Sequence, residues 1–572
     1  MKERGLDGKR KKRAMLVLAA LLTVAAAFLP NARAGIFLGY DGWFHMARIE
    51  SLATALQNGI FPVKVHPSLN FMYGYGVGFF YPDFFLYFPA ALMVLGVSVT
   101  MAYKIFLLLL LTALFAGTYA VLCRLTESRA AALCGAVALT LSMNLFWNIY
   151  HILSLGIITA YVFVPLALGG FCLCVQGKKG AAFLGIGLAG ALLSHSTTFL
   201  LLCTALVLLS FLHMRTIFSV RGLLCRLLLT VGAVVAVTAG YWLPALEQFG
   251  KQRFKVSAAP LIQIGGQVGT AGKFVFEQFG LCMTVLLLLS WGIWGYGKAR
   301  RERQSLLFSL LLTDTLLNIL VFFRPFWELT GDTFNFLQFP WRIVQVTTPL
   351  TALAFAVAAG SLARAVGGAG RENLRLRRML WLAAAGIFVF SSASSYRFVW
   401  TDLIAAREKL DGRVIAQEIR GTSSGEEWLP AECSGSHFDQ PDTAIDETGS
   451  GAQGEKLRGG SVFSAYVDLG KTYYTAPFVY YYGYRAFLEN EDGTRRELRT
   501  DKSDYDGQLR VWMPEEEAGV GKITVGYQKT TLQKISYGIS AAAAAGIAAV
   551  WLVNRQKKRS EAMAEKRKAK EA

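Results

Sequence analysis

The sequence predicts a polytopic α-helical membrane protein of about 12 transmembrane helices, with a small extracytoplasmic domain resembling a β-sandwich. Three observations carry this prediction. Hydrophobic residues make up 54% of the 572 positions, they fall in long uninterrupted runs, and most of the carboxylates gather in the segment 397–534. A single soluble core could not bury so much apolar surface, so lipid must cover most of it.

The apolar runs are long enough to cross a bilayer. A hydrocarbon core about 30 Å thick needs roughly 20 apolar residues per helix. Runs of this length include Ile105–Leu122, Leu223–Leu243 and Ile343–Ala363. These runs predict membrane-spanning helices.

The net charge of +19 could indicate a nucleic-acid partner, but the basic residues are distributed as the positive-inside rule requires. They crowd into short loops between apolar runs and into the two ends, Lys9–Arg13 and Arg555–Arg559. We therefore expect the lipid bilayer as a partner and no nucleic acid.

One assignment of spans puts every short basic loop on the cytoplasmic side. It has both termini in the cytoplasm of a multi-pass protein of the cell (plasma) membrane. The expected spans are 14–30, 104–122, 130–147, 155–175, 181–195, 197–213, 223–243, 279–297, 305–323, 343–363, 379–396 and 535–553. The first run is expected to stay as an anchor, although Ala32-Arg33-Ala34 resembles a signal-peptidase site.

The run Phe79–Gly96 must stay outside in this assignment. It is apolar but interrupted by Pro82, Asp83 and Pro89, and if it crossed, Arg124 and Arg129 would face outward. We interpret it as an interfacial or re-entrant helix on the outer side.

Three regions follow from this topology. Residues 1–396 form a transmembrane module whose first outer loop is 31–103, residues 397–534 form the outer β domain, and residues 535–572 form a last helix with a basic tail. Within the β domain the expected strands are Val462–Leu469, Phe478–Leu488, Gln508–Met513 and Lys522–Gln528.

A candidate site lies just after the first span. On a helix, positions i, i+4 and i+7 share a face, so Asp41, His45 and Arg48 would project together. A carboxylate, an imidazole and a guanidinium could accept a proton, hold a hydroxyl group and bind a phosphate. The alternative is a helix N-cap with a solvated polar face.

Further motifs along the chain resemble those of the bacterial membrane proteins named 6-pyruvoyl-tetrahydropterin synthase-related. The motifs are Gly59–Val65, Gly74-Tyr75-Gly76, Phe80–Ala90, Ala102–Phe106, Gln338–Arg342 and Glu427–Pro430. That family in turn resembles the C-type (GT-C) superfamily of membrane glycosyltransferases, which includes oligosaccharyltransferase catalytic subunits and protein O-mannosyltransferases. The resemblance implies a GT-C-like module with outer interfacial helices and an acidic residue in the first outer loop.

The resemblance also implies an activity, transfer of a sugar from a polyprenyl-phosphate donor to an extracytoplasmic glycan or wall-polymer acceptor. Phosphate departs as a stable anion, so the enzyme would need a base for the acceptor hydroxyl and cations for the phosphate. Asp41 and His45 are the catalytic candidates. Glycoside hydrolases differ, because they commonly need two carboxylates.

Five further residues are candidates for substrate binding: Arg48, Arg342, Arg324, His151 and His195. Three of them have a structural alternative. Arg342 could be an interfacial anchor beside Trp341, His151 a capped interfacial histidine, and His195 a turn residue between two helices.

No cofactor is expected. Several superfamily members carry a second acid in the outer loop after the third span, but here Asn148–Ser154 has no carboxylate. A divalent cation is the alternative, because His45, His66, His151, His195 and His437 all fall on the predicted outer side, although without paired-ligand spacing.

Two other functions remain open. A transporter or lipid flippase would also need many helices, but charges inside the spans are sparse, Asp314 being the clearest. A non-catalytic scaffold whose β domain recruits wall components would not require the group around Asp41.

Overall fold

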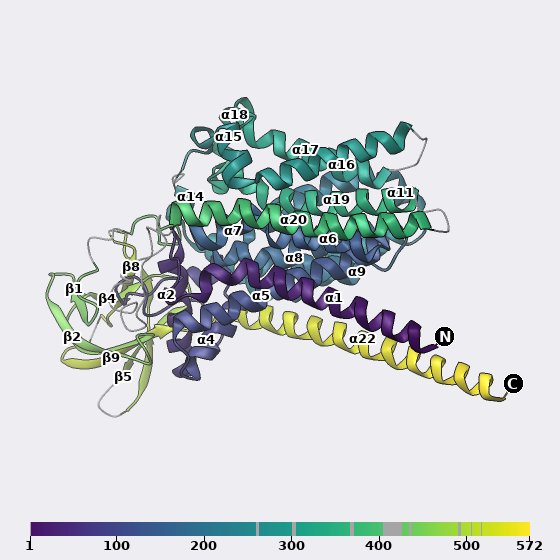
Figure 1. Cartoon of the computed structure of the whole chain (residues 1–572). Coiled ribbons are helices and arrows are strands. Elements are labelled where there is room, and N and C mark those ends of the chain that lie inside the picture. The colour runs from purple at the N-terminus through teal and green to yellow at the C-terminus, as the bar shows by residue number, and fades with distance from the viewer. Residues whose placement is uncertain are drawn as a thin grey trace.

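The computed structural model of the chain describes residues 2–258, 262–299, 305–365, 371–403, 426–433, 438–489, 493–504, 506–515 and 517–571. It is a bundle of long helices with a β domain at one end (Figure 1). The predicted fold class is confirmed in outline.

Nine helical segments in the described residues are long and apolar enough to cross a membrane, or ten if one bent pair is a single span. The nine are Arg13–Ala32, Val99–Thr126, Arg129–Ile152, Leu155–Val175, Leu281–Lys298, Ser305–Phe322, Pro340–Arg364, Arg378–Trp400 and Thr531–Glu561. The expected spans 181–195 and 197–213 are the shorter apolar helices α9 (Ala181–Leu192) and α10 (Ser196–Leu212).

These segments belong to helices whose bounds are α1 (Lys2–Phe28), α5 (Val99–Thr126), α6 (Arg129–Thr140), α7 (Met143–Phe146), α8 (Leu155–Val175), α16 (Leu281–Ala299), α17 (Ser305–Phe322), α19 (Val344–Ala365), α20 (Arg371–Leu403) and α22 (Thr531–Glu571). Shorter elements connect them: α2 (Gly42–Gln57), α11 (Met214–Ser219), α14 (Lys255–Ala258), α15 (Ala271–Lys273), α18 (Arg324–Phe334), and the one-turn or π segments η1 (Leu29–Ala32), η3 (Trp147–Ile152), η4 (Ile264–Gln267), η5 (Phe274–Gln278), η6 (Asn335–Leu337) and η7 (Pro340–Ile343).

The expected span 223–243 is bent in the structure. The helix breaks at Thr238 into α12 (Leu223–Val237) and α13 (Ala239–Lys251), which meet at 67°. The physical reason is in the polar residues of α13. Gln248 donates to the Tyr482 carbonyl at 2.7 Å and accepts from the Tyr482 N–H at 3.1 Å, which ties α13 to the β domain.

The run Phe79–Gly96 does not form a long helix. It is divided among α3 (Val77–Phe80), η2 (Phe84–Leu86) and α4 (Tyr87–Val94). Even the longest apolar stretch, Phe84–Val94, is too short to cross a bilayer at about 1.5 Å per residue. The prediction that this run stays at one surface agrees with the structure.

The loops group at the two ends of the bundle as the charge pattern predicted. At one end, Lys178 donates to the Arg124 carbonyl at 3.2 Å, and Arg364 donates to the Thr126 carbonyl at 2.8 Å. The chain termini lie toward this end, and α2 and the β domain lie at the other (Figure 1). The assignment of the basic end to the cytoplasm rests on the positive-inside rule.

The β domain is a continuous antiparallel sheet in the described residues, with the strand order β6-β5-β9-β3-β2-β1-β4-β8-β7. Its strands are β1 (Thr443–Asp446), β2 (Gly451–Leu457), β3 (Val462–Asp468), β4 (Tyr473–Val479), β5 (Tyr484–Glu489), β6 (Arg495–Leu498), β7 (Thr500–Lys502), β8 (Gln508–Trp512) and β9 (Val520–Tyr527). The expected single strand Phe478–Leu488 is wrong, because a turn containing Gly483 at φ +122° separates β4 from β5.

The first outer loop is built into the β domain. Tyr73, Tyr75 and Phe79 of that loop are buried in the same hydrophobic cluster as Phe463 and Ile523 of the sheet. The Tyr73 carbonyl also accepts the Val479 N–H at 2.9 Å. The β domain is therefore fixed against the end of the bundle through the loop that leads to the candidate site.

The orientation can be tested by cysteine labelling from outside the cell, in a variant lacking the eight native cysteines. Ser98 is exposed at the end that carries the β domain, and Ser128 lies at the basic end. We expect an impermeant maleimide to label Ser98→Cys but not Ser128→Cys in intact cells, and both after solubilisation. Outside labelling of Ser128→Cys would contradict the orientation.

Candidate functional site

Asp41 is held by the backbone on the loop that enters α2. Gly39 adopts φ +55°, and a Cβ there would lie 2.3 Å from the His151 carbonyl oxygen, so only glycine fits. The Asp41 N–H donates to the Ile152 carbonyl at 2.8 Å. Asp41 occupies the N-cap position, but its side chain makes no capping hydrogen bond. The N-cap alternative therefore does not explain this carboxylate.

The environment of Asp41 favours its protonated form. Burial raises the pKa of Asp41 from 3.8 to about 6, the nearby Arg342 guanidinium opposes this rise, and the Glu427 carboxylate adds to it. The carboxyl thus sits between a cation and a second anion from distant parts of the chain. A group with a pKa near 6 is ionised at neutral pH and can still accept a proton there.

Arg342 is positioned by a strained turn. Gln338 has φ +62° and ψ −44°, and the Phe339 N–H reaches back to the Leu337 carbonyl at 2.7 Å, the geometry of a γ-turn that is rare for residues other than glycine. The side chain of Gln338 accepts a hydrogen bond from Arg342 Nη2 at 2.6 Å, and the guanidinium lies 5.6 Å from the Phe339 ring centre.

Arg342 keeps hydrogen-bonding capacity after these contacts. Its Nε is buried and has no hydrogen-bond partner among the described residues. Buried donors are usually satisfied, so an unsatisfied one beside a carboxylate indicates a place for an anionic or hydroxylated ligand.

His195 is the N-cap of α10. Its Nδ1 accepts the Thr198 N–H at 3.2 Å and lies 2.8 Å from Thr198 Oγ1, which in turn contacts Gln345 Oε1 at 2.5 Å. These bonds occupy Nδ1, so the imidazole can offer only Nε2 to a ligand. His195 is thus the turn residue between α9 and α10, and its role in substrate binding stays a prediction.

Arg48 lies deeper than the helical spacing suggested. It is fully buried and donates from Nη2 to Asp83 at 2.5 Å, to the Tyr81 carbonyl at 3.2 Å and to the Pro82 carbonyl at 3.1 Å. His66 contacts the second oxygen of Asp83 at 2.9 Å. Burial raises the pKa of Asp83, but Arg48 and His66 together lower it to about 2. Arg48 is thus engaged in an internal ion pair.

His45 is buried beside Arg48, with Nδ1 at 3.3 Å from Arg48 Nη1. Burial and then the charges of Arg48 and His195 hold the pKa of His45 well below 6.5, against the opposing effect of Asp83. The imidazole is therefore neutral, and it packs against Arg48 and the ring of Tyr81.

Tyr81 joins these groups. Its ring lies 4.2 Å from the Arg48 guanidinium and within 5.6 Å of the rings of His45 and His195. Gly156 leaves room for its hydroxyl, because a Cβ there would approach that oxygen to 2.4 Å. Electrostatic effects link Tyr81 to both Asp41 and Arg342.

His151 and Arg324 are placed elsewhere. His151 lies in a ring cluster with Trp147 at 4.0 Å and Tyr40 at 5.2 Å, behind the Asp41 backbone. Arg324 forms an exposed ion pair with Glu328 at 2.9 Å on the surface of α18. The structure therefore brings together Asp41, His195 and Arg342, with His45 and Arg48 beneath them.

Four contributors were not recognised as site residues from the sequence: Tyr81, Asp83, Gln345 and Glu427. Asp83 carried a local signal as a carboxylate inside an apolar run, and Tyr81 and Glu427 lie in the motifs Phe80–Ala90 and Glu427–Pro430. Their place at the site follows from contacts across the fold.

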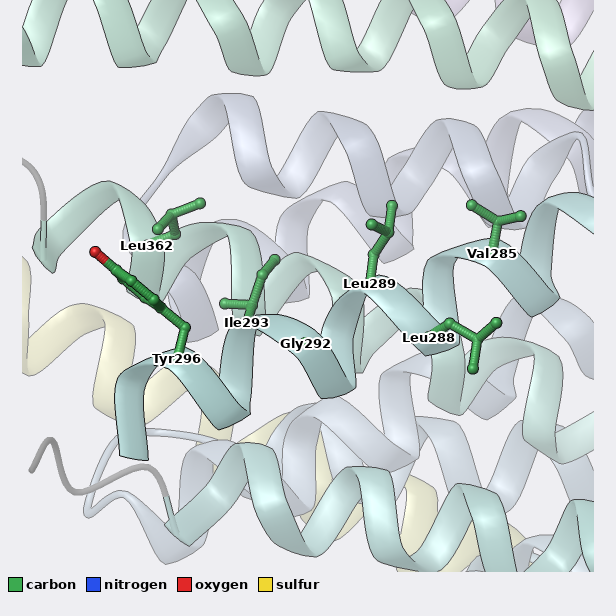
Figure 2. A pocket seen from close by; sticks show the side chains of 7 residues that line it. All are labelled: Val285, Leu288, Leu289, Gly292, Ile293, Tyr296 and Leu362. Carbon is green, nitrogen blue, oxygen red and sulfur yellow. The ribbon is translucent and has the colours of Figure 1, made fainter. Parts of the chain in front are cut away.

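A groove of about 550 Å³ lies away from this site, lined by Leu288, Leu289 and Ile293 of α16 and Leu362 of α19 (Figure 2). Apart from the hydroxyl group of Tyr296, the side chains that Figure 2 draws there are hydrocarbon. Within the described part of the chain, no group of three or more His, Cys, Asp or Glu residues could hold a metal ion, and His437 lies outside that part.

A family model for a family of unknown function (DUF6541) matches residues 2–418. The chain belongs to this family. An uncharacterized protein of Lactococcus lactis subsp. cremoris is 24% identical over 265 residues, 44% of this chain and 43% of that protein. The chain therefore covers less than half of that relative.

Two solved structures are similar in part. An Archaeoglobus fulgidus oligosaccharyltransferase is 15% identical, with a TM-score of 0.41, over 66% of this chain and 52% of its own. The arabinofuranosyltransferase AftD from Mycobacteria is 19% identical, with a TM-score of 0.44, over 68% and 28%. At such scores neither carries a functional argument. The expected likeness to 6-pyruvoyl-tetrahydropterin synthase-related proteins has no support in these comparisons.

The buried Arg48–Asp83 pair should matter for stability. Asp83→Asn leaves a buried guanidinium without its counter-charge, which typically costs about 3 to 5 kcal/mol. We expect a clearly lower Tm of the purified protein. The matched control Glu328→Gln removes the carboxylate of the exposed Arg324 pair, worth about 1 kcal/mol at most, and should barely change the Tm. Equal Tm values for the two variants would contradict the structural role.

Proposed function

We propose that the protein is a membrane glycosyltransferase that moves a sugar from a polyprenyl-phosphate donor to a hydroxyl group of an extracytoplasmic glycan or cell-envelope acceptor. The observation that carries the proposal is the partly buried Asp41 carboxyl, whose pKa burial raises to about 6 and on which the guanidinium of Arg342 acts. Asp41 is the N-cap of α2, which lies at the end of the bundle where the β domain sits (Figure 1).

The chemistry needs one base and one cation. Asp41 takes the proton of the acceptor hydroxyl as its oxygen attacks the anomeric carbon of the donor sugar. The bond from that carbon to the phosphate oxygen breaks, and the phosphate leaves with the electron pair. Arg342 stabilises the developing charge, since a guanidinium can hold two phosphate oxygens at once.

The neighbouring groups have supporting roles in this scheme. His195 offers Nε2 to a sugar hydroxyl, while its Nδ1 stays bound to the N-terminus of α10. Arg48 is fully buried, so we assign it the positioning of Tyr81 instead of contact with phosphate. His45 is neutral and supports the same stack of rings.

The alternative of a transporter or flippase has less support. Such proteins commonly carry ionisable groups along a path through the membrane. Asp314 is fully buried and is hydrogen-bonded by Asn318 at 2.9 Å and Thr351 at 2.5 Å, so it ties α17 to α19. This is the contact pattern of a structural residue.

Loss of the base should abolish transfer while leaving the fold intact. We expect Asp41→Asn to lower the transfer rate by about 10² to 10⁴, because an amide cannot accept the proton. Asp504→Asn, an exposed carboxylate of the β domain, should keep the wild-type rate. Near-normal transfer by a well-expressed Asp41→Asn variant would exclude the base role.

The pH dependence of the wild type provides a second readout of Asp41. Transfer needs the ionised carboxylate, so kcat/KM should rise with pH through about 6. The raised pKa means that the folded state binds the Asp41 proton more tightly than the unfolded state. The contribution of this proton to the free energy of unfolding is therefore lost as the pH rises from 3.8 through about 6. Asp41→Asn should therefore be at least as stable as the wild type at pH 7.

The phosphate contact can be separated from a simple anchoring role by Arg342→Lys. An interfacial anchor tolerates lysine, whereas a planar two-oxygen clamp does not. We expect weaker binding of a polyprenyl-phosphate sugar, with expression and Tm unchanged. Arg324→Lys makes the same exchange at the surface pair and should leave binding intact. Unaltered donor affinity in both Arg342→Lys and Arg342→Ala would remove Arg342 from the site.

A further inference from the structure

A short strap, residues 426–430, connects the β domain to the candidate site. Its backbone runs antiparallel to the segment after α13: the Val256 N–H donates to the Glu427 carbonyl at 3.1 Å, and the Lys255 N–H donates to the Leu429 carbonyl at 2.9 Å. The Glu426 side chain forms an ion pair with Lys255. The strap is thus joined to the segment after α13 by backbone hydrogen bonds, with an isolated antiparallel bridge between Phe254 and Pro430.

Side chains on both sides of Glu427 are anchored as well. The Trp428 ring stacks on Phe80, with centres 4.7 Å apart and planes 14° from parallel. The Trp428 N–H donates to the Tyr75 hydroxyl at 3.2 Å, and its carbonyl accepts from the Tyr481 hydroxyl at 2.9 Å. Phe80 directly precedes Tyr81, which interacts with Asp41. The stack therefore fixes the position of the strap relative to the residues of the candidate site.

Glu427 is partly buried between these anchors. Its charge acts on two groups of the site, raising the pKa of Asp41 and interacting with the Arg342 guanidinium. Arg342 therefore interacts electrostatically with both carboxylates, and its buried Nε has no partner among the described residues.

We propose that Glu427 is a second carboxylate of the Asp41 site, carried in by the strap, and that it accepts hydrogen bonds from hydroxyl groups of the sugar acceptor. This role rests on the proposed glycosyl transfer. A carboxylate is a strong acceptor with about four lone-pair sites, so Glu427 can accept hydroxyl donors from a ligand in addition to its contacts within the protein. The acceptor would then be a polyol, with one hydroxyl at Asp41 and neighbouring hydroxyls at Glu427.

The proposal makes the β domain part of the reaction site. The strap leads into the sheet through Glu432, which forms an ion pair with Lys502 at 2.7 Å. The β domain also packs on the bundle through the stacked rings of Phe254 and Tyr481. The position of the β domain therefore determines the position of Glu427. Acceptor binding is therefore tied to the docked position of the β domain.

The test uses the full-length protein in lipid nanodiscs and the variant Glu427→Gln. Its first readout needs no activity: the titration of the Asp41 carboxyl, followed by infrared difference spectra against Asp41→Asn. The charges of Arg342 and Glu427 act on Asp41, and Tyr81 interacts with it. Arg48, His45 and His195 interact with one another and with Arg342 or Asp83 in the same cluster. Removing the Glu427 charge should move the Asp41 midpoint to lower pH, because that charge raises it.

The second readout is the kinetic split between the two substrates, measured with a polyprenyl-phosphate hexose and the simplest alkyl glycoside that the wild type accepts. We expect Glu427→Gln to raise the acceptor KM by about 10-fold or more, with donor affinity unchanged. The matched control is Glu455→Gln, which removes an exposed carboxylate of β2 and should move neither readout.

An Asp41 midpoint and an acceptor KM that both stay at wild-type values in Glu427→Gln, while the wild type is active, would overturn this inference and leave the proposed function standing. A wild type that transfers sugar to no acceptor would refute the proposed function and the acceptor role together. The Asp41 titration then decides by itself whether Glu427 shares the site.

Discussion

The ion pair between Arg48 and Asp83 holds the end of the bundle together. It is fully buried and joins α2 to the outer loop, while His66 attaches the same carboxylate to the part of the loop that enters the β-domain core. A buried pair is expensive to desolvate, so it persists only where every partner is in place. Its geometry sets the position of Tyr81, and through Phe80 that of the strap. The site and the docked β domain therefore depend on one contact.

Three neighbouring segments determine the position and the pKa of Asp41. The backbone at Gly39 fixes the chain, a γ-turn at Gln338 presents Arg342, and the strap brings Glu427. The resulting arrangement is an anion, a cation and a second anion in a partly dry setting, where charges interact more strongly than in water. Such an arrangement suits a proton transfer coupled to the departure of a phosphate, which is the reaction we propose.

The sequence predicts those features of the fold that depend on hydrophobic run length and on loop charge. Run length and loop charge gave most of the long helices and the short outer helices after Phe79. They failed where tertiary contacts decide, as at the 67° bend after α12 and in β2, whose polar strand Gly451–Leu457 carries no hydrophobic alternation. Helical spacing placed Arg48 with Asp41, but a carboxylate 35 residues away draws it inward. Glu427 could not be assigned from the sequence, because only folding brings the strap to the outer loop.

The central claim is that the Asp41 site binds the phosphate of a polyprenyl carrier. The most direct test is a structure of the full-length protein in nanodiscs, determined by electron cryo-microscopy with a polyprenyl phosphate present. The account predicts density for the phosphate at the Arg342 guanidinium, on the side facing Asp41, with the prenyl chain leading toward lipid. A phosphate bound elsewhere, with Arg342 contacting only Gln338 and Phe339, would contradict it.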